Sequence, residues 1–166
     1  MLSTTICLLV REDSIYLPMK KRGFGMGNHN GYGGKKRADE SWENAACREL
    51  FEESGVQVNP KQLFFVAELL YDFPHKPEWD QRTRVYLIHD WVGEPVESDE
   101  MSPTWFSINH LPLDKMWASD GFWLPPVLDK KYVRASFTYD ANKVIVKKSL
   151  ELFDDRTRFE QVIIPK

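Results

Sequence analysis

Hydrophobic residues recur along the chain in short runs separated by polar turns, a pattern typical of a protein rich in β-strands. Two such runs, residues 4–10 and 14–21, flank a polar turn and predict a β-hairpin near the start of the chain. Residues 132–140 and 143–152 predict a second hairpin around the turn at 140–142. Further strands are predicted in the runs at residues 63–73, 84–92 and 103–108.

One segment between these runs, residues 41–54, has a helical composition. Ser41 suits the N-cap of this helix, and Gly55 suits the position just beyond its end. A second helix is expected at residues 121–131 only if Pro125 lies in its first turn, where a missing N–H costs nothing. The apolar side of the first helix is expected to pack on a sheet and to contain Ala46, Cys47, Leu50 and Phe51.

Length, composition and charge narrow the class of protein. The 166 residues suffice for one domain, and an apolar fraction of 42% indicates a globular chain. A net charge of −3 without a long basic run argues against a nucleic-acid polymer as partner, whereas a small phosphorylated ligand needs only local cations. The first apolar run is too short to span a membrane and lacks the basic lead of a signal peptide. We therefore expect a monomeric, cytoplasmic α+β domain with a mixed sheet, no membrane partner and two buried, reduced cysteines, Cys7 and Cys47.

Two further features of the sequence indicate a functional site. Residues 22–34 contain six glycines in thirteen positions, which marks a functional loop or a bent strand. Three carboxylates, Glu49, Glu52 and Glu53, share one face at the end of the first predicted helix, where they repel one another and the helix dipole disfavours negative charge. A bound divalent cation would reverse both penalties, and an all-oxygen ligand set suits Mg²⁺ or Mn²⁺.

The spacing of these carboxylates resembles the complete Nudix box. Its signature positions are filled by Gly34, Glu40, Arg48, Glu49, Leu50, Glu52, Glu53, Gly55 and Val56. The resemblance implies an α/β/α sandwich and a divalent-metal hydrolase that cleaves a nucleoside diphosphate linked to another group. Water would attack a phosphorus atom in this reaction.

Membership of that family would give several residues a role. Glu49, Glu52, Glu53 and the carbonyl group of Gly33 would be metal ligands. Glu40 would support the loop through Arg48 rather than touch the metal. Glu53, or a group outside the box, would take the proton of the attacking water.

The resemblance continues beyond the box. The stretches MKKRGFG, NGYGGK, PVESDEM, WF and KMW are similar in order and spacing to the mammalian-type MutT homologues, which hydrolyse oxidised purine nucleoside triphosphates. The likeness covers residues 4–137 and implies a Mg²⁺ enzyme, with Mn²⁺ as an alternative, that converts 8-oxo-dGTP to its monophosphate and pyrophosphate. It adds Glu100 to the metal ligands and gives a catalytic group of Arg48, Glu52, Glu53 and Glu100. It also implies a base pocket lined by Thr5, Lys20, Phe24, Asn30, Tyr71, Trp117 and Asp120.

One position departs from that subfamily. Ser119 precedes Asp120, where the mammalian-type enzymes carry two consecutive aspartates. Two adjacent carboxylates can share a proton, whereas Asp120 alone is expected to have a less perturbed pKa and to act mainly as a hydrogen-bond acceptor. This predicts a preference for 8-oxo-dGTP over 2-oxo-dATP, with both residues touching the base.

Other interpretations stay open at this point. The substrate could be another nucleotide, such as a dinucleotide polyphosphate or the 5′ end of an RNA. A catalytically silent nucleotide-binding module is the third interpretation, which the intact carboxylates disfavour. We divide the chain into a Nudix domain at residues 1–152 and a C-terminal extension at residues 153–166, whose role the pattern does not indicate.

Overall fold

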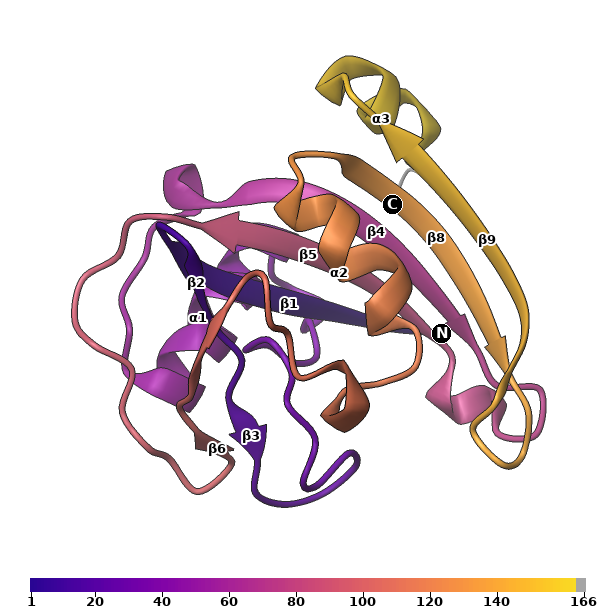
Figure 1. Ribbon diagram of the computed structural model, residues 1–166, viewed down its shortest axis with the longest axis horizontal. Coiled ribbons are helices and arrows are strands. Elements are labelled where there is room, and N and C mark those ends of the chain that lie inside the picture. Colours follow the sequence, from indigo (N-terminus) through magenta and orange to yellow (C-terminus); the bar gives the residue numbers. More distant parts are fainter. Residues whose placement is uncertain (164–166) are drawn as a thin grey trace.

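A seven-stranded mixed sheet forms the centre of the computed structural model, which describes residues 1–163 (Figure 1). The strand order is β7-β2-β1-β5-β4-β8-β9, with β1 parallel to β5 and β4 parallel to β8. The remaining neighbours are antiparallel. The strands are β1 Leu2–Arg11, β2 Ser14–Tyr16, β4 Phe64–Asp72, β5 Gln81–Ile88, β7 Trp105–Ser107, β8 Tyr132–Tyr139 and β9 Ile145–Phe153.

Helices lie on both faces of this sheet, as Figure 1 shows. The α-helices are α1 Trp42–Ser54, α2 Asp120–Leu128 and α3 Arg156–Val162. Short 3₁₀ turns are η1 Pro60–Gln62, η2 Pro77–Trp79 and η3 Leu113–Lys115. None of the helices within residues 1–163 is long and apolar enough to cross a membrane.

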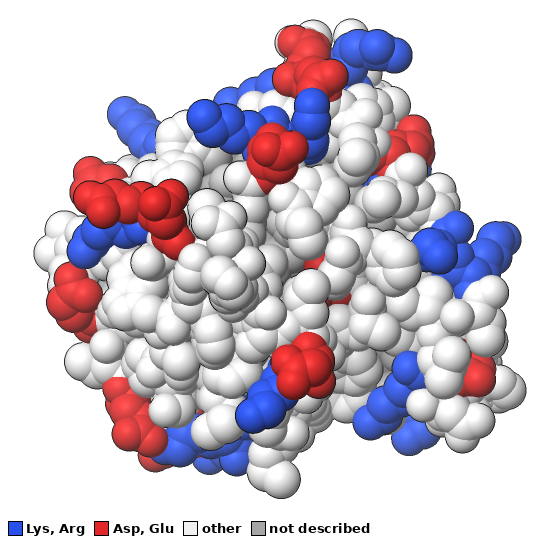
Figure 2. Space-filling view, viewed as in Figure 1, with Lys and Arg blue, Asp and Glu red and all other residues white. Residues whose placement is uncertain are grey.

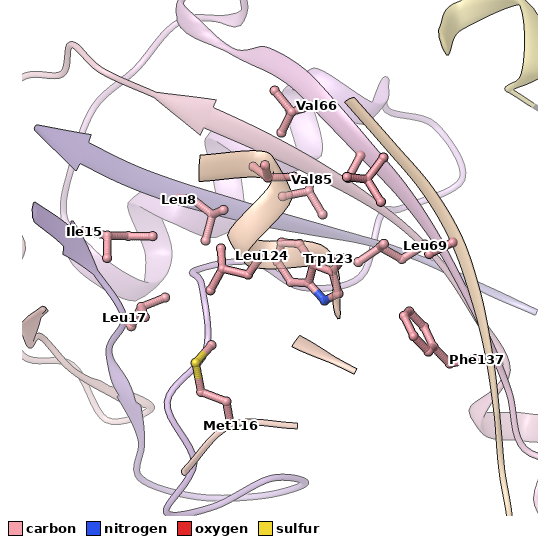
Figure 3. Packing of buried hydrophobic residues seen from close by; sticks show 14 of the residues in the cluster. Leu8, Ile15, Leu17, Val66, Leu69, Val85, Met116, Trp123, Leu124 and Phe137 are labelled. Atoms are coloured by element: carbon pink, nitrogen blue, oxygen red, sulfur yellow. The ribbon is translucent and has the colours of Figure 1, made fainter. Parts of the chain in front are cut away.

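Side chains that alternate along the strands supply two separate cores. On β1, Leu8 points into the core beneath α2, where it joins Trp123 and Leu124 (Figure 3). Its neighbours Cys7 and Leu9 belong to the opposite core, together with residues of α1. This is the period of two expected of a strand that is buried on both sides. The expected α/β/α sandwich with a mixed sheet is confirmed.

Local signals set the limits of α1 as the sequence predicts. The Ser41 hydroxyl accepts a hydrogen bond from the backbone N–H of Asn44 at 3.1 Å, which caps the first turn. Gly55 takes a left-handed conformation with φ of 74° and closes the last turn with a 2.8 Å bond to the Phe51 carbonyl. The prediction for the apolar face is wrong at Phe51, which is exposed. The buried apolar side chains are Trp42, Ala45, Ala46 and Leu50.

Both hairpins are confirmed, with one break. Strand β2 ends at Tyr16 because Pro18 has no N–H for the ladder. The chain then continues as β3 Met19–Lys20, which leaves the main sheet and pairs with a strand that the sequence pattern did not indicate, β6 Met101–Ser102. Among the predicted buried thiols, Cys7 is buried, whereas Cys47 is partly exposed.

The helix α2 contradicts the expectation about proline. It begins at Asp120, so Pro125 and its neighbour Pro126 lie in the second turn. Each proline removes one N–H from the helical hydrogen bonds. Trp123 and Leu124 of this helix are almost completely buried against the sheet, and their packing stabilises a helix that local propensity disfavours.

The end of the chain packs on the sheet through one aromatic residue. Phe159 of α3 is fully buried, and its ring contacts those of Phe65, Tyr132 and Phe153 at centroid distances of 5.0, 5.4 and 6.0 Å. Residues 164–166 of the expected C-terminal extension lie outside the described residues. The helix α3 is therefore attached to β8 and β9 by apolar burial.

We predict that Phe159→Ala lowers the free energy of unfolding by about 3–5 kcal/mol, because it empties a buried aromatic site. Chemical denaturation followed by circular dichroism measures this change. Phe51→Ala, in which the same ring is removed from an exposed site on α1, is the matched control and should cost less than about 1 kcal/mol. Equal effects of the two substitutions would show that α3 is not anchored by this contact.

Candidate active site

An acidic pocket lies beside the C-terminal half of α1. It has a volume of about 260 Å³ and is lined by Arg22, Glu49, Glu52, Glu53, Ser98, Asp99 and Glu100. The spacing along α1 brings the first three glutamates to one face, and the loop before β6 adds Glu100 from the other side. The four glutamates expected to bind metal therefore face one space.

Arg48 holds two of these carboxylates, those of Glu49 and Glu52, in place. Its Nε and Nη2 atoms donate to the two oxygens of Glu40 at 3.0 and 2.6 Å, and Nη2 also donates to the Lys35 carbonyl. Its Nη1 atom donates to Glu49 at 2.6 Å and to Glu52 at 3.3 Å. The bonds from Arg48 lower the pKa of Glu40 to about 2. Glu40 thus pairs with Arg48 and does not line the acidic pocket.

Glu53 is the most buried of the four carboxylates. Its Oε2 atom accepts a 2.8 Å hydrogen bond from the backbone N–H of Gly33. The pKa of Glu53 is raised to about 8, chiefly by burial and also by the nearby charges of Glu49 and Glu100, while the Gly33 N–H and Lys20 act in the opposite direction. A cation bound in this pocket would stabilise the charged form of Glu53.

The two glycines at the end of the glycine-rich segment fit closely around this site. A Cβ atom at Gly34 would lie 2.5 Å from Oε2 of Glu49, so a side chain there would displace the carboxylate. Gly33 has a φ of 149°, and a Cβ atom there would lie 1.9 Å from the Thr5 carbonyl oxygen. Gly33 therefore requires glycine on steric grounds, whereas a side chain at Gly34 could be accommodated only if the Glu49 carboxylate moved.

The donor set fits a divalent metal ion. Within residues 1–163, no group of three or more acidic, histidine or cysteine side chains is arranged to hold a metal ion. The chemistry nevertheless suits one, since five carboxylates, those of the four glutamates and Asp99, line a single pocket and offer oxygen donors. One carboxylate oxygen of Glu49 and one of Glu52 accept hydrogen bonds from Arg48. Metal binding would therefore require these two side chains to shift toward the pocket.

A larger cavity of about 410 Å³ lies beside the acidic pocket and is lined on one side by the start of α2 and the residues just before it. All seven residues expected to bind the base line it: Thr5, Lys20, Phe24, Asn30, Tyr71, Trp117 and Asp120. They come from β1, β3, β4, the glycine-rich loop, the segment before α2 and the first residue of α2. Figure 2 shows this face of the molecule, where the centre is largely uncharged and most charged side chains lie toward the rim.

Aromatic rings form one wall of the cavity. Phe24 and Trp117 stack with centroids 5.0 Å apart and planes inclined by 24°. Trp79 of η2 contacts the edge of Phe24 at 4.7 Å, and the ammonium group of Lys143 lies 5.4 Å from the Phe24 ring. A purine can stack on such a wall.

Several lining residues were not among the candidates. Phe73 follows Tyr71 by two positions and shares its side of the chain, so strand alternation could have identified it. Trp79, Trp123 and Tyr139 reach the cavity only through the tertiary fold, and no local signal marks them.

The match of residues 2–125 to the family model described as the NUDIX domain decides the assignment. The chain belongs to the Nudix family. It is 40% identical over 151 residues to the oxidized purine nucleoside triphosphate hydrolase of Danio rerio, an alignment that covers 91% of this chain and 95% of the relative. It is 36% identical over 150 residues to the protein of the same name from Mus musculus, with coverage of 90% and 94%.

Solved structures agree with the Nudix fold. A MutT protein from Bacillus halodurans superimposes with a TM-score of 0.79 at 23% identity, covering 91% of this chain and 98% of that one. A MutT NUDIX hydrolase from Burkholderia pseudomallei superimposes with a TM-score of 0.61 at 29% identity, covering 67% and 86%.

The pKa of Asp120 differs from the expectation of a less perturbed carboxylate. It is almost fully buried, and burial raises its pKa to about 7. Trp123 Nε1 donates to Oδ1 at 3.0 Å and the Trp117 backbone N–H donates to Oδ2 at 3.2 Å, and both bonds oppose the rise. A carboxyl group with this pKa is partly protonated near neutral pH, so Asp120 could donate a hydrogen bond as well as act mainly as an acceptor.

Ser119 also lies elsewhere than expected. It is fully buried behind Asp120 and does not line the cavity. Its backbone N–H donates to the Tyr139 hydroxyl at 3.3 Å, and its own hydroxyl donates to Oδ1 of Asp120 at 3.4 Å. Ser119 thus contacts the carboxylate and not the space that a base would occupy.

The raised pKa of Asp120 predicts a pH-dependent stability. The native protein keeps a proton on Asp120 up to about pH 7, whereas the unfolded chain loses it near pH 4. Stability contributed by this proton is therefore present at low pH and is lost as the pH rises toward 7. Relative to Asp120→Asn, the unmodified protein should lose about 1–3 kcal/mol of unfolding free energy between pH 5 and pH 8.

Urea unfolding at a series of pH values measures this difference. Asp114→Asn, at an exposed position in η3, is the matched control and should leave the pH profile of the unmodified protein unchanged. A constant gap between the unmodified protein and Asp120→Asn across this range would contradict the assignment of a raised pKa.

Proposed function

We propose that this Nudix protein is a Mg²⁺-dependent pyrophosphohydrolase of oxidised purine nucleoside triphosphates, with Mn²⁺ as an alternative ion. The products would be a nucleoside monophosphate and pyrophosphate, with 8-oxo-dGTP as the leading substrate. The observation that carries this proposal is the contact between the two sites. Gly33 lines the aromatic cavity, and its N–H holds Glu53 in the acidic pocket.

The relatives support the choice of substrate. Two proteins that align with at least nine-tenths of this chain are named oxidized purine nucleoside triphosphate hydrolases. The cavity offers the groups that an oxidised purine requires, since Phe24 and Trp117 present ring faces and Asn30 presents both a donor and an acceptor. Such nucleotides are soluble metabolites, and the proposal places the activity in the cytoplasm.

Glu49, Glu52, Glu53 and Glu100 would hold the metal ion, together with the carbonyl group of Gly33. The ion would neutralise charge on the phosphates during hydrolysis, which is the main requirement of phosphoryl chemistry. The protein's own groups would orient the carboxylates, the phosphates and the base. Arg48 keeps Glu49 and Glu52 oriented, Lys20 places a cation between cavity and pocket, and the aromatic wall orients the base.

In the proposed reaction water adds across the anhydride bond between the α- and β-phosphates. The oxygen of the water forms a new bond to phosphorus, and the bridging oxygen leaves with pyrophosphate. Glu53, which faces the pocket and is fixed by Gly33, is positioned to take the proton of the water.

A panel of oxidised and normal nucleoside triphosphates, a dinucleotide polyphosphate and a capped RNA tests the proposal. With Mg²⁺ present we expect pyrophosphate release from 8-oxo-dGTP with the highest kcat/KM of the panel. Glu53→Gln should lower kcat by about 10²–10⁴-fold, because a charged ligand and proton acceptor is lost.

Circular dichroism establishes that this variant is folded. Glu43→Gln is the matched control on the same helix, and it should retain full activity because Glu43 lies outside the acidic pocket. Higher kcat/KM for the dinucleotide or the RNA would reassign the substrate. No turnover of any panel member would instead support a silent binding module.

The raised pKa of Asp120 changes the expected base selectivity. The ionised form accepts hydrogen bonds from the N–H groups of 8-oxoguanine, whereas the protonated form can donate to a ring nitrogen. We predict that the ratio of kcat/KM for 8-oxo-dGTP to that for 2-oxo-dATP rises with pH between about 6 and 8. Steady-state kinetics with both substrates measures it.

In Asp120→Asn this pH dependence of selectivity should disappear, and turnover of the guanine substrate should fall by about 10–100-fold. Ser119→Asp restores a carboxylate pair and should broaden the substrate range. A selectivity ratio in the unmodified protein that stays constant with pH would remove Asp120 from base recognition.

A further inference from the structure

Three polar side chains of the sheet line the cavity without belonging to the expected base pocket. They are Thr4 of β1 and Gln81 and Thr83 of β5. Thr4 and Thr83 are register partners on neighbouring parallel strands, and their hydroxyl oxygens lie 2.7 Å apart. The Thr4 hydroxyl donates to Oε1 of Gln81 at 3.3 Å. Because a hydroxyl carries one proton, Thr83 donates to Thr4, and the hydrogen bonds run in one direction from Thr83 to Gln81.

The carboxamide of Gln81 keeps unused hydrogen-bonding capacity. Its Oε1 atom has a second lone pair, and the two N–H groups of Nε2 have no partner among residues 1–163. The side chain is partly exposed and lines the cavity. A donor and an acceptor are therefore available side by side at the cavity, and the bond from Thr4 determines which end of the amide is the oxygen.

This donor and acceptor match the edge by which an 8-oxopurine differs from a normal purine. In a normal purine N7 is an acceptor and C8 carries only hydrogen, whereas in the 8-oxo form N7 carries a proton and C8 carries a carbonyl oxygen. Oε1 of Gln81 can accept from N7–H while Nε2 donates to O8, as a carboxamide makes two bonds to adenine. Against a normal purine the fixed Oε1 would face the lone pair of N7. The amide therefore favours the oxidised edge.

Gln81 approaches the cavity from a different layer than the carboxylate expected to bind the base. Asp120 comes from α2, whereas Gln81 comes from the sheet, where it is the register partner of Tyr71. All three residues line the same cavity. A purine carries N1 and C8 at opposite ends of its ring system. When Asp120 binds the N1 end, the C8 end faces away from α2, toward the layer that carries Gln81.

We propose that Gln81 is a specificity-determining residue, whose amide binds the N7–H and O8 edge of an 8-oxopurine nucleotide. Thr4 is a positioning residue, since it acts through the orientation of this amide. The inference rests on the proposed function, because it concerns the base that the same cavity accepts. It adds a direct contact with the oxidised atoms themselves, which Asp120 at the other end of the base does not supply.

Binding of four nucleoside monophosphates, followed by tryptophan fluorescence in the absence of metal, tests the inference. Two of them, 8-oxo-dGMP and 8-oxo-dAMP, carry the oxidised edge, whereas dGMP and 2-oxo-dAMP do not. Gln81→Leu keeps a side chain of similar size and removes the amide. We expect Kd to rise by about 10–100-fold for both 8-oxo nucleotides and by less than about threefold for the other two.

Thr4→Val leaves Gln81 in place and removes the hydroxyl that orients its amide. This variant should reduce the preference for the two 8-oxo nucleotides by about 3–10-fold. Gln57→Leu, at an exposed position beyond α1 that lines neither pocket, is the matched control and should leave all four Kd values unchanged. Circular dichroism establishes that each variant is folded.

Equal losses for all four nucleotides in Gln81→Leu would overturn the inference, because the side chain would then serve the cavity in general. A preference for 8-oxo nucleotides that survives this substitution, or that the unmodified protein lacks, would overturn it as well. Hydrolysis is measured separately with 8-oxo-dGTP and Mg²⁺. If the unmodified protein shows the preference in binding but releases no pyrophosphate, the proposed function fails and the assignment of Gln81 stands.

Discussion

One guanidinium group holds the acidic end of α1 together. Arg48 reaches Glu40 on one side and Glu49 and Glu52 on the other, and it also binds the carbonyl of Lys35. Without it, the carboxylates would repel one another at the negative end of the helix dipole. The same bonds fasten the loop after Gly34 to the helix, and that loop continues back into the cavity. The positions of both pockets therefore depend on this one side chain.

The sequence was most informative where the determinants are local. Ser41 and Gly55 mark the ends of α1 because capping depends on a few neighbouring residues. The pairing of Glu40 with Arg48 likewise follows from their fixed spacing in the Nudix box. These features could be predicted without knowledge of the tertiary fold.

Features that depend on distant parts of the chain were missed. Strand β6 consists of two residues and exists because β3 lies beside it. The prolines of α2 are tolerated because Trp123 is buried against the sheet, which propensity alone does not indicate. The protonation of Asp120 depends on how deeply the fold buries it. Ser119 follows the same rule, since its adjacency to Asp120 in sequence did not place it beside the base.

The backbone of Gly33 connects the cavity to the acidic pocket. Its N–H donates to Glu53, and the Thr5 carbonyl lies so close that a Cβ atom at this position would collide with it. The distance between the cavity and the acidic pocket is therefore set by the backbone of β1 and the glycine loop. Side chains of the cavity can change during evolution, and with them the base that is recognised. The distance between the two pockets would stay the same, and with it the phosphate bond that the proposed reaction cleaves.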